Sequence, residues 1–196
     1  MWQSAEHVGL LYRDDLDNVS YVLHLAFHND LRRSTPNSTQ FFSEMLAADD
    51  LNQNLIAAVC MAIYQANPQG IPYGIRWDES GFSPETGAWN GATPYSGATC
   101  ATFIMHVCAN IGLSLITEDD WPRREDDREW QDRIVRVLEA NGVEQAHCQA
   151  QLEVVGSARF RPCEVAAAAS SLDAPLTHVD AIPRGVVLKD FVLHAM

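Results

Sequence analysis

The sequence predicts an α+β fold, in which an antiparallel sheet packs against helices, and three observations support this class. The first thirty residues have the pattern of a β-hairpin, helical periodicity dominates the middle of the chain, and apolar runs typical of strands return near its end. The chain of 196 residues has the usual length of one domain, so we assign residues 1–196 to a single domain.

Residues 7–12 and 21–26 are short apolar runs, and residues 14–18 between them have turn chemistry, which predicts the hairpin. One choice of turn centre places residues whose numbers sum to 31 directly opposite each other, and His7 and His24 are such a pair. Directly opposed side chains share a face of the sheet. Two imidazoles can then meet there, one as a general base and the other orienting it.

A short helix is expected over residues 40–47 and a longer one over residues 50–66. In the longer one, apolar residues recur every four positions, and an aspartate at its start can cap the helix. Residues 68–98 are rich in glycine and proline, which predicts a long loop with one strand around residues 73–77. Loops of this length in compact domains are often functional.

A further helix is expected from Cys100 to Gly112, where the glycine can end it. Residues 117–141 predict a highly charged helix, whose alternating acidic and arginine residues indicate a solvated face with ion pairs. The last fifty residues predict an alanine-rich helix over 162–171 and two further strands of the antiparallel sheet over 152–155 and 186–193.

Composition narrows the functional classes. Hydrophobic residues make up 47% of the chain and charged residues 20%, which is typical of a globular protein. The 26 acidic residues outnumber the 13 basic ones, giving a net charge of −13, and Lys189 is the only lysine. This charge disfavours nucleic acids and anionic membrane surfaces as partners. No stretch approaches the roughly 20 apolar residues of a membrane span, so integral membrane association is not expected.

The N-terminal segment and the cysteines indicate the cellular compartment in which the protein is expected. Residues 1–7 lack the basic and then apolar run of a signal peptide. The number of cysteines is odd and no CxxC pair occurs, which is typical of reduced thiols. They are Cys60, Cys100, Cys108, Cys148 and Cys163. We therefore expect a cytoplasmic protein, with export by a route that needs no cleavable signal as the open alternative.

Cys100 is the candidate nucleophile because of its place in the predicted helix. Thr99 can cap that helix, which puts Cys100 in the first turn, beside unpaired backbone N–H groups and the positive end of the helix dipole. Such a placement is expected to lower the pKa of the thiol and to supply a donor for a developing oxyanion. A cysteine taken alone is more often a small buried residue, so the hairpin histidines are what favour catalysis.

The segments HVGLLY (residues 7–12), VLHLA (22–26) and TCATFI (99–104) resemble the circularly permuted branch of the NlpC/P60 papain-like superfamily. Lecithin–retinol acyltransferase and its phospholipid acyltransferase relatives belong to that branch. In it the histidine strands precede the cysteine helix, as they do here. The resemblance implies a papain-like fold with the nucleophile-bearing helix packed on the sheet. It also implies Cys100 as nucleophile, His7 as base and His24 as the orienting third member.

The resemblance further implies a cysteine hydrolase of the amidase or peptidase type, acting on peptidoglycan or another peptide through a thioester on Cys100. Lipid acyl transfer in the related enzymes usually goes with a membrane anchor, which this chain lacks, and this favours a peptide substrate. An acyltransferase or thioesterase of the same fold is one alternative. Another is a non-catalytic binding protein that uses its acidic surface for a protein partner. Trp77 and Trp89 are candidate walls of a substrate groove.

No cofactor and no metal ion are expected. His24 and His28 have the i,i+4 spacing of a metal pair on a helix, but they lie in a strand pattern and lack the glutamate of an HExxH motif. His147, Cys148 and Cys163 are too irregularly spaced for a structural zinc site. His106, Cys108 and Cys60 are expected to be packing residues, and no P-loop, GxGxxG or GxSxG motif occurs.

Overall fold

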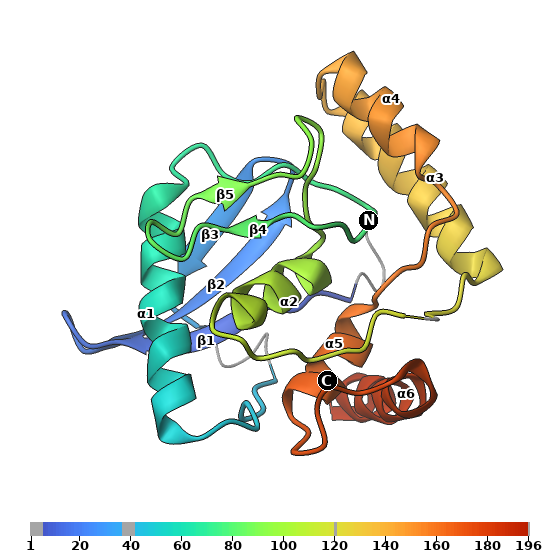
Figure 1. The fold of residues 1–196 in the computed structure, drawn as a ribbon. Coiled ribbons are helices and arrows are strands. Elements are labelled where there is room, and N and C mark those ends of the chain that lie inside the picture. The colour runs from blue at the N-terminus through green and yellow to red at the C-terminus, as the bar shows by residue number, and fades with distance from the viewer. Residues whose placement is uncertain (1–5, 37–41, 120, 196) are drawn as a thin grey trace.

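The computed structural model describes residues 6–36, 42–119 and 121–195 and confirms the α+β class (Figure 1). The larger sheet is antiparallel and consists of β1 (Leu10–Asp14), β2 (Val19–Phe27) and β3 (Asp30–Ser34), with β2 in the centre. A separate two-stranded hairpin consists of β4 (Gly81–Phe82) and β5 (Trp89–Asn90).

The β1–β2 hairpin forms as predicted, but its register differs. Leu10 pairs with Leu23, so the numbers of paired residues sum to 33 instead of 31. The turn lies later in the chain than expected. Asp14 and Asp17 stabilise it, because each accepts a hydrogen bond from the backbone N–H group two residues further on. Gly9 is therefore the residue opposite His24. A shift of two residues leaves every side chain on its expected face, since strand side chains alternate.

Helices α1 (Asp50–Ala66) and α2 (Cys100–Asn110) pack against the sheet, with α1 along β1 and α2 across β2 (Figure 1). Both begin where the sequence predicts, because each has a side-chain cap. Asp49 accepts a hydrogen bond from the third residue of its helix, and Thr99 forms a capping box with Thr102. The shared core includes Leu23, Leu25, Ile63, Phe103, Ile104 and Val107.

The C-terminal half is helical in the part that the structure describes, so the two strands predicted there are wrong. Its helices are α3 (Glu125–Ala140), α4 (Gln145–Glu153), α5 (Pro162–Ala169) and α6 (His178–Ala195). Helices α3 and α4 form a hairpin on one side of the molecule, and α5 and α6 pack together near α2 (Figure 1). Residues 152–155 belong to the end of α4 and the turn after it, and residues 186–193 lie within α6.

Two other helix predictions also need correction. Residues 42–47 are not helical, because Ala47 instead donates a backbone hydrogen bond to Ala169 at 2.8 Å, while the rest of the predicted 40–47 helix lies outside the described residues. The charged helix begins at Glu125 rather than at 117. Ahead of it, Trp121 is buried and donates its indole N–H to a backbone carbonyl, which fixes the chain in a non-helical path.

The charged helix also carries a buried ionic cluster, where the sequence predicted a solvated face. Asp127 is 1% exposed and contacts Arg124 at 2.5 Å, Arg161 at 2.8 Å and Arg159 at 3.3 Å. Glu164 of α5 is 2% exposed and also pairs with Arg124 at 2.5 Å. The acidic residues are buried here because each has several guanidinium donors that replace water.

The long loop of residues 68–98 is organised by two backbone segments that cross just ahead of α2. The strand predicted around residues 73–77 is reduced to one bridge pair between Tyr73 and Ala98. A Cβ atom on Gly97 would collide with the backbone of Pro72, and one on Gly74 would lie 2.6 Å from the carbonyl oxygen of Gly97. The crossing therefore requires both glycines, and it fixes the start of the helix that bears Cys100.

The outer face of α6 is apolar and exposed, with Val186, Val187 and Phe191 between 53% and 70% accessible. Its inner face packs on α5. Within the described ranges, no helix combines the length and the apolar character needed to cross a membrane.

Candidate functional site

Cys100 is the first residue of α2 and is 8% exposed. The capping box at Thr99 fixes its backbone, and the N–H groups of Val8 and Ala101 lie close to its sulfur. Val8 directly follows His7 in the chain. The start of the Cys100 helix is therefore packed against the backbone that carries the first candidate histidine.

His7 and His24 meet, as the hairpin pattern predicts. His7 Nε2 and His24 Nδ1 are 2.7 Å apart and form a hydrogen bond, and the two rings are perpendicular with centroids 4.8 Å apart. Gly9 makes this contact possible, because a Cβ atom at that position would lie 3.0 Å from the Cβ of His24. The bond uses Nε2 of His7 and leaves Nδ1 as the nitrogen that can take a proton from a thiol.

Cys100 is not hydrogen-bonded to either imidazole among the residues that the structure describes. The geometry of β2 explains why. Leu23 and Leu25 point into the core below α2, so His24 between them points to the opposite face of the sheet. Val8, whose N–H lies close to the Cys100 sulfur, packs on the core face of the sheet, whereas the histidine pair lies on the other face.

The pKa of the Cys100 thiol differs from the one that the sequence predicts. Burial raises the pKa of the Cys100 thiol and outweighs the nearby N–H groups of Val8 and Ala101, so the predicted lowering is wrong. Desolvation, followed by the charges of His24 and Arg32, lowers the pKa of His7 to about 4. At neutral pH the site therefore holds a neutral thiol and a neutral imidazole, and the proton transfer has to accompany the attack of sulfur.

Arg159 lies near the site, although no motif in the sequence points to it. Its positive charge opposes the rise in the pKa of Cys100 and acts on Tyr73 in the same direction. The guanidinium is held by Asp127 and stacks on Trp130 at 3.6 Å, and its side chain is 15% exposed. No motif surrounds Arg159, and 58 positions separate it from Cys100, so only the tertiary structure shows their proximity.

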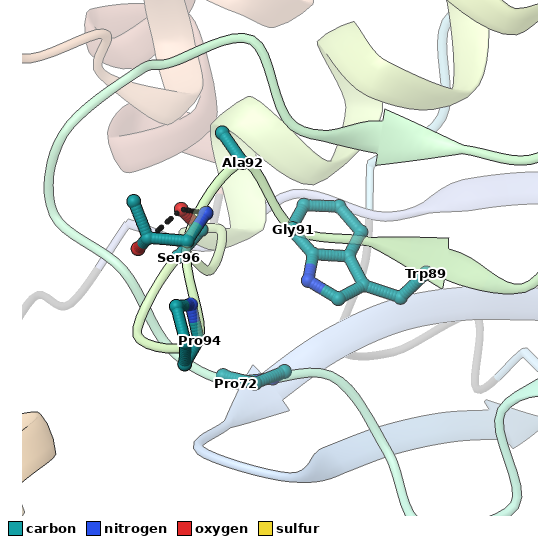
Figure 2. A pocket seen from close by; sticks show the side chains of 7 residues that line it. Pro72, Trp89, Gly91, Ala92, Pro94 and Ser96 are labelled. Atoms are coloured by element: carbon teal, nitrogen blue, oxygen red, sulfur yellow. Dashed lines mark hydrogen bonds between the residues drawn. The ribbon is translucent and has the colours of Figure 1, made fainter.

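A candidate groove borders the loop that leads to Cys100. A cavity of about 430 Å³ is lined by residues that include Pro72, Pro94 and Trp89, and Figure 2 shows their side chains. Trp89 Nε1 is buried and has no hydrogen-bond partner among the described residues. Trp89 therefore lines this cavity, but Cys100, His7 and His24 do not, so a role of Trp89 in a substrate groove at Cys100 stays a prediction. Trp77 is not among the lining residues and instead stacks on His106 in the core, with ring centroids 4.3 Å apart.

A second cavity, of about 280 Å³, lies on the other side of the same loop. Its lining includes Arg76 and Asp78 from the long loop, together with Gln151 and Glu153 from α4. The two cavities share Thr93 and Ser96, whose hydroxyl groups are hydrogen-bonded to each other at 3.0 Å.

The remaining histidines and cysteines occupy several places in the fold, and Cys163 contacts Glu6, which directly precedes His7. Cys60, Cys108 and His106 are buried in the core, as expected of packing residues. His28, which directly follows β2, contacts His147 of α4, with ring centroids 4.6 Å apart. Among the described residues, no group of three or more His, Cys, Asp or Glu side chains is arranged to hold a metal ion.

Comparison of the chain with protein-family models, with curated protein sequences and with solved structures gave no match.

Proposed function

We propose that the chain is a papain-like cysteine hydrolase of the permuted NlpC/P60 type, which cleaves an amide bond in a peptide or a peptidoglycan fragment. The observation that carries the proposal is the 2.7 Å hydrogen bond between His7 and His24, at a strand end that packs against the first turn of the Cys100 helix. The chain order of the three residues supports the permuted arrangement.

In the proposed reaction, His7 Nδ1 takes the proton of the Cys100 thiol as the sulfur attacks the scissile carbonyl carbon. First-turn N–H groups of α2 are donors to the oxyanion that forms. The C–N bond then breaks, and protonated His7 gives its proton to the leaving amine. A water molecule, deprotonated by His7, hydrolyses the thioester and restores the thiol. In the structure as it stands, His24 holds the ring of His7 through the hydrogen bond at Nε2.

The geometry requires one conformational step before the chemistry. His7 has to turn from the face of the sheet that it shares with His24 so that Nδ1 faces the Cys100 sulfur. Catalytic hydrogen bonds are often loose in the absence of substrate and tighten in the complex. An ester or thioester substrate would pass through the same intermediate, so acyl transfer differs only in the group that accepts the acyl chain.

A non-catalytic binding protein is the second candidate. It is favoured by one observation, the placement of the histidine pair on the opposite face of the sheet from the core below α2. The acidic surplus would then provide the partner surface.

Alkylation of the thiols by iodoacetamide at pH 7 separates the two candidates. A hydrolase is expected to alkylate faster at Cys100 than at the deeper Cys60 and Cys108, and to lose that advantage in His7→Ala, because His7 assists deprotonation. Equal rates at Cys100 in wild type and His7→Ala would exclude His7 as its base. The pKa of Cys108 is raised to about 12 by burial, so it is the internal reference.

A further inference from the structure

His28 and His147 contact the backbone of one residue, Tyr73, from two sides. The backbone N–H of Tyr73 donates to His28 Nδ1 at 3.2 Å, and His147 Nε2 is 2.8 Å from the carbonyl oxygen of the same residue. His28 follows β2, which bears His24, and His147 lies on α4. We call these two side chains the histidine clamp.

The segment around Tyr73 that the histidine clamp contacts is also hydrogen-bonded at several other points. The turn after β2 docks on it through a hydrogen bond from Asn29 N–H to the carbonyl of Ile71, at 2.9 Å. From α4, Gln151 accepts a hydrogen bond from Ile75 N–H at 3.0 Å and donates to the carbonyl of Tyr95 at 2.9 Å. Both of the loop segments that cross at Gly74 and Gly97 are therefore hydrogen-bonded to α4.

The segment around Tyr73 is bonded to the residues that directly precede Cys100, the proposed nucleophile. Tyr73 is bridged to Ala98, and Ala98 donates its backbone N–H to the carbonyl of Pro72 at 3.0 Å. Thr99, the cap of α2, follows Ala98, and Cys100 follows the cap. A displacement of Tyr73 is thus transmitted over a few bonded residues to the Cys100 backbone.

We propose that His28 and His147 are positioning residues, which set the place of Cys100 by holding both the N–H and the C=O of Tyr73 between β2 and α4. This inference rests on the proposed hydrolase function. It gives the α3–α4 hairpin a role in the site, although that hairpin lies outside the segments on which the family resemblance depends.

The clamp depends on the protonation state of His28. Neutral His28 accepts the hydrogen bond from Tyr73 N–H with the lone pair of Nδ1, and a protonated ring has no such acceptor. A charged His28 would also face the ring of His147, and Tyr73 and Tyr95 are the other titratable groups around the pair. Burial, and then the neighbouring His147, lower the pKa of His28 to about 4, so the clamp is closed at neutral pH.

Amide hydrogen exchange of Tyr73 and Ile75 tests the clamp without any substrate. In wild type, protection at Tyr73 relative to α1 amides is expected to fall at least tenfold between pH 7 and pH 4. His28→Leu removes the acceptor and should lose this protection already at pH 7. His28→Asn, whose side-chain oxygen can replace Nδ1 and does not titrate, should keep it at both pH values. His194→Asn on the exposed end of α6 is the matched control.

The rate at which iodoacetamide alkylates Cys100 at pH 8 measures whether the histidine clamp positions Cys100. His147→Leu should change this rate at least threefold, and His147→Gln, whose amide N–H can replace Nε2–H, should restore it. Unchanged Tyr73 protection in His28→Leu at pH 7 would overturn the clamp. Altered protection with an unchanged alkylation rate in His147→Leu would overturn the positioning of Cys100. Neither readout requires turnover, so failure of the hydrolase proposal would appear separately, as absence of an acyl adduct.

Discussion

At the scale of single residues, the proposed function gives the two ring nitrogens of His7 different tasks. Nε2 is hydrogen-bonded to His24, and Nδ1 is the nitrogen proposed to take the thiol proton. Because burial raises the pKa of the Cys100 thiol, the proposed reaction depends on this base more than one in a site with a preformed thiolate.

Substitution of the two histidines should therefore have graded effects on acyl transfer to Cys100. His7→Ala removes the base and should cause the largest loss. His24→Ala should lower the rate roughly 10- to 1000-fold, less than the loss seen for the orienting aspartate of a serine triad. His24→Gln keeps one hydrogen bond to His7 and should retain more activity. The burst of nitrophenol from an activated ester measures all three, and a wild-type rate in His24→Ala would remove His24 from the site.

The pH profile of acylation follows from the pKa of His7. A base has to be unprotonated, so the rate should fall only as the pH drops through about 4, rather than through the ordinary histidine value of 6.5. The rate should continue to rise toward alkaline pH, because the pKa of the Cys100 thiol is raised. An acidic limb centred near 6.5 would mean that a different histidine is the base.

The contact between the two histidines is predictable from the sequence, because it requires only that both side chains lie on the same face of the hairpin. The assumed register was two residues in error, and strand periodicity made that error harmless. The pKa of the thiol was not predictable, since burial by distant residues outweighs the local helix terminus. Arg159 was missed for a similar reason.

At the scale of elements, the crossing of two loop segments places the Cys100 helix. Gly97→Ala introduces a Cβ atom into the backbone of Pro72 and should destabilise the fold by about 1–3 kcal/mol or displace the start of α2. Gly81→Ala is the matched control, because a Cβ atom there meets nothing within 4 Å. Urea unfolding of both variants measures the difference. Equal stability would show that the crossing tolerates the extra atom.

The elements that the sequence located correctly have local signals at their ends. Asp49 and Thr99 cap α1 and α2, and Pro162 lies at the start of α5. The apolar run of residues 186–193 predicts a strand wrongly, because a short apolar run does not distinguish a strand from a helix. They form part of α6, whose inner face packs on α5 while apolar residues also cover its outer face.

At the scale of the whole molecule, several buried or half-buried histidines make stability depend on pH. His106 is 3% exposed, and desolvation, partly offset by Asp78, lowers its pKa to about 4 from 6.5. Between these two values the unfolded chain binds a proton that the folded chain does not. Stability should therefore fall as the pH drops from about 6.5 toward 4, by about 3 kcal/mol for this residue.

His106→Phe tests this dependence while keeping an aromatic ring against Trp77 and Trp89. The free energy of unfolding in urea, measured at pH 7 and pH 4.5, should drop less in the variant than in wild type. The same loss in both proteins would mean that His106 does not titrate on unfolding in this range.

In the proposed function Cys100 forms an acyl intermediate with the help of His7, and mass spectrometry can detect that intermediate as a trapped adduct. Wild-type protein mixed with an activated acyl ester and quenched in acid should gain one acyl group, located on the peptide that contains Cys100. His7→Ala should gain it far more slowly, and Cys100→Ala should not gain it although it remains folded. Acylation of another residue, or equal acylation of Cys100 in wild type and His7→Ala, would contradict the account.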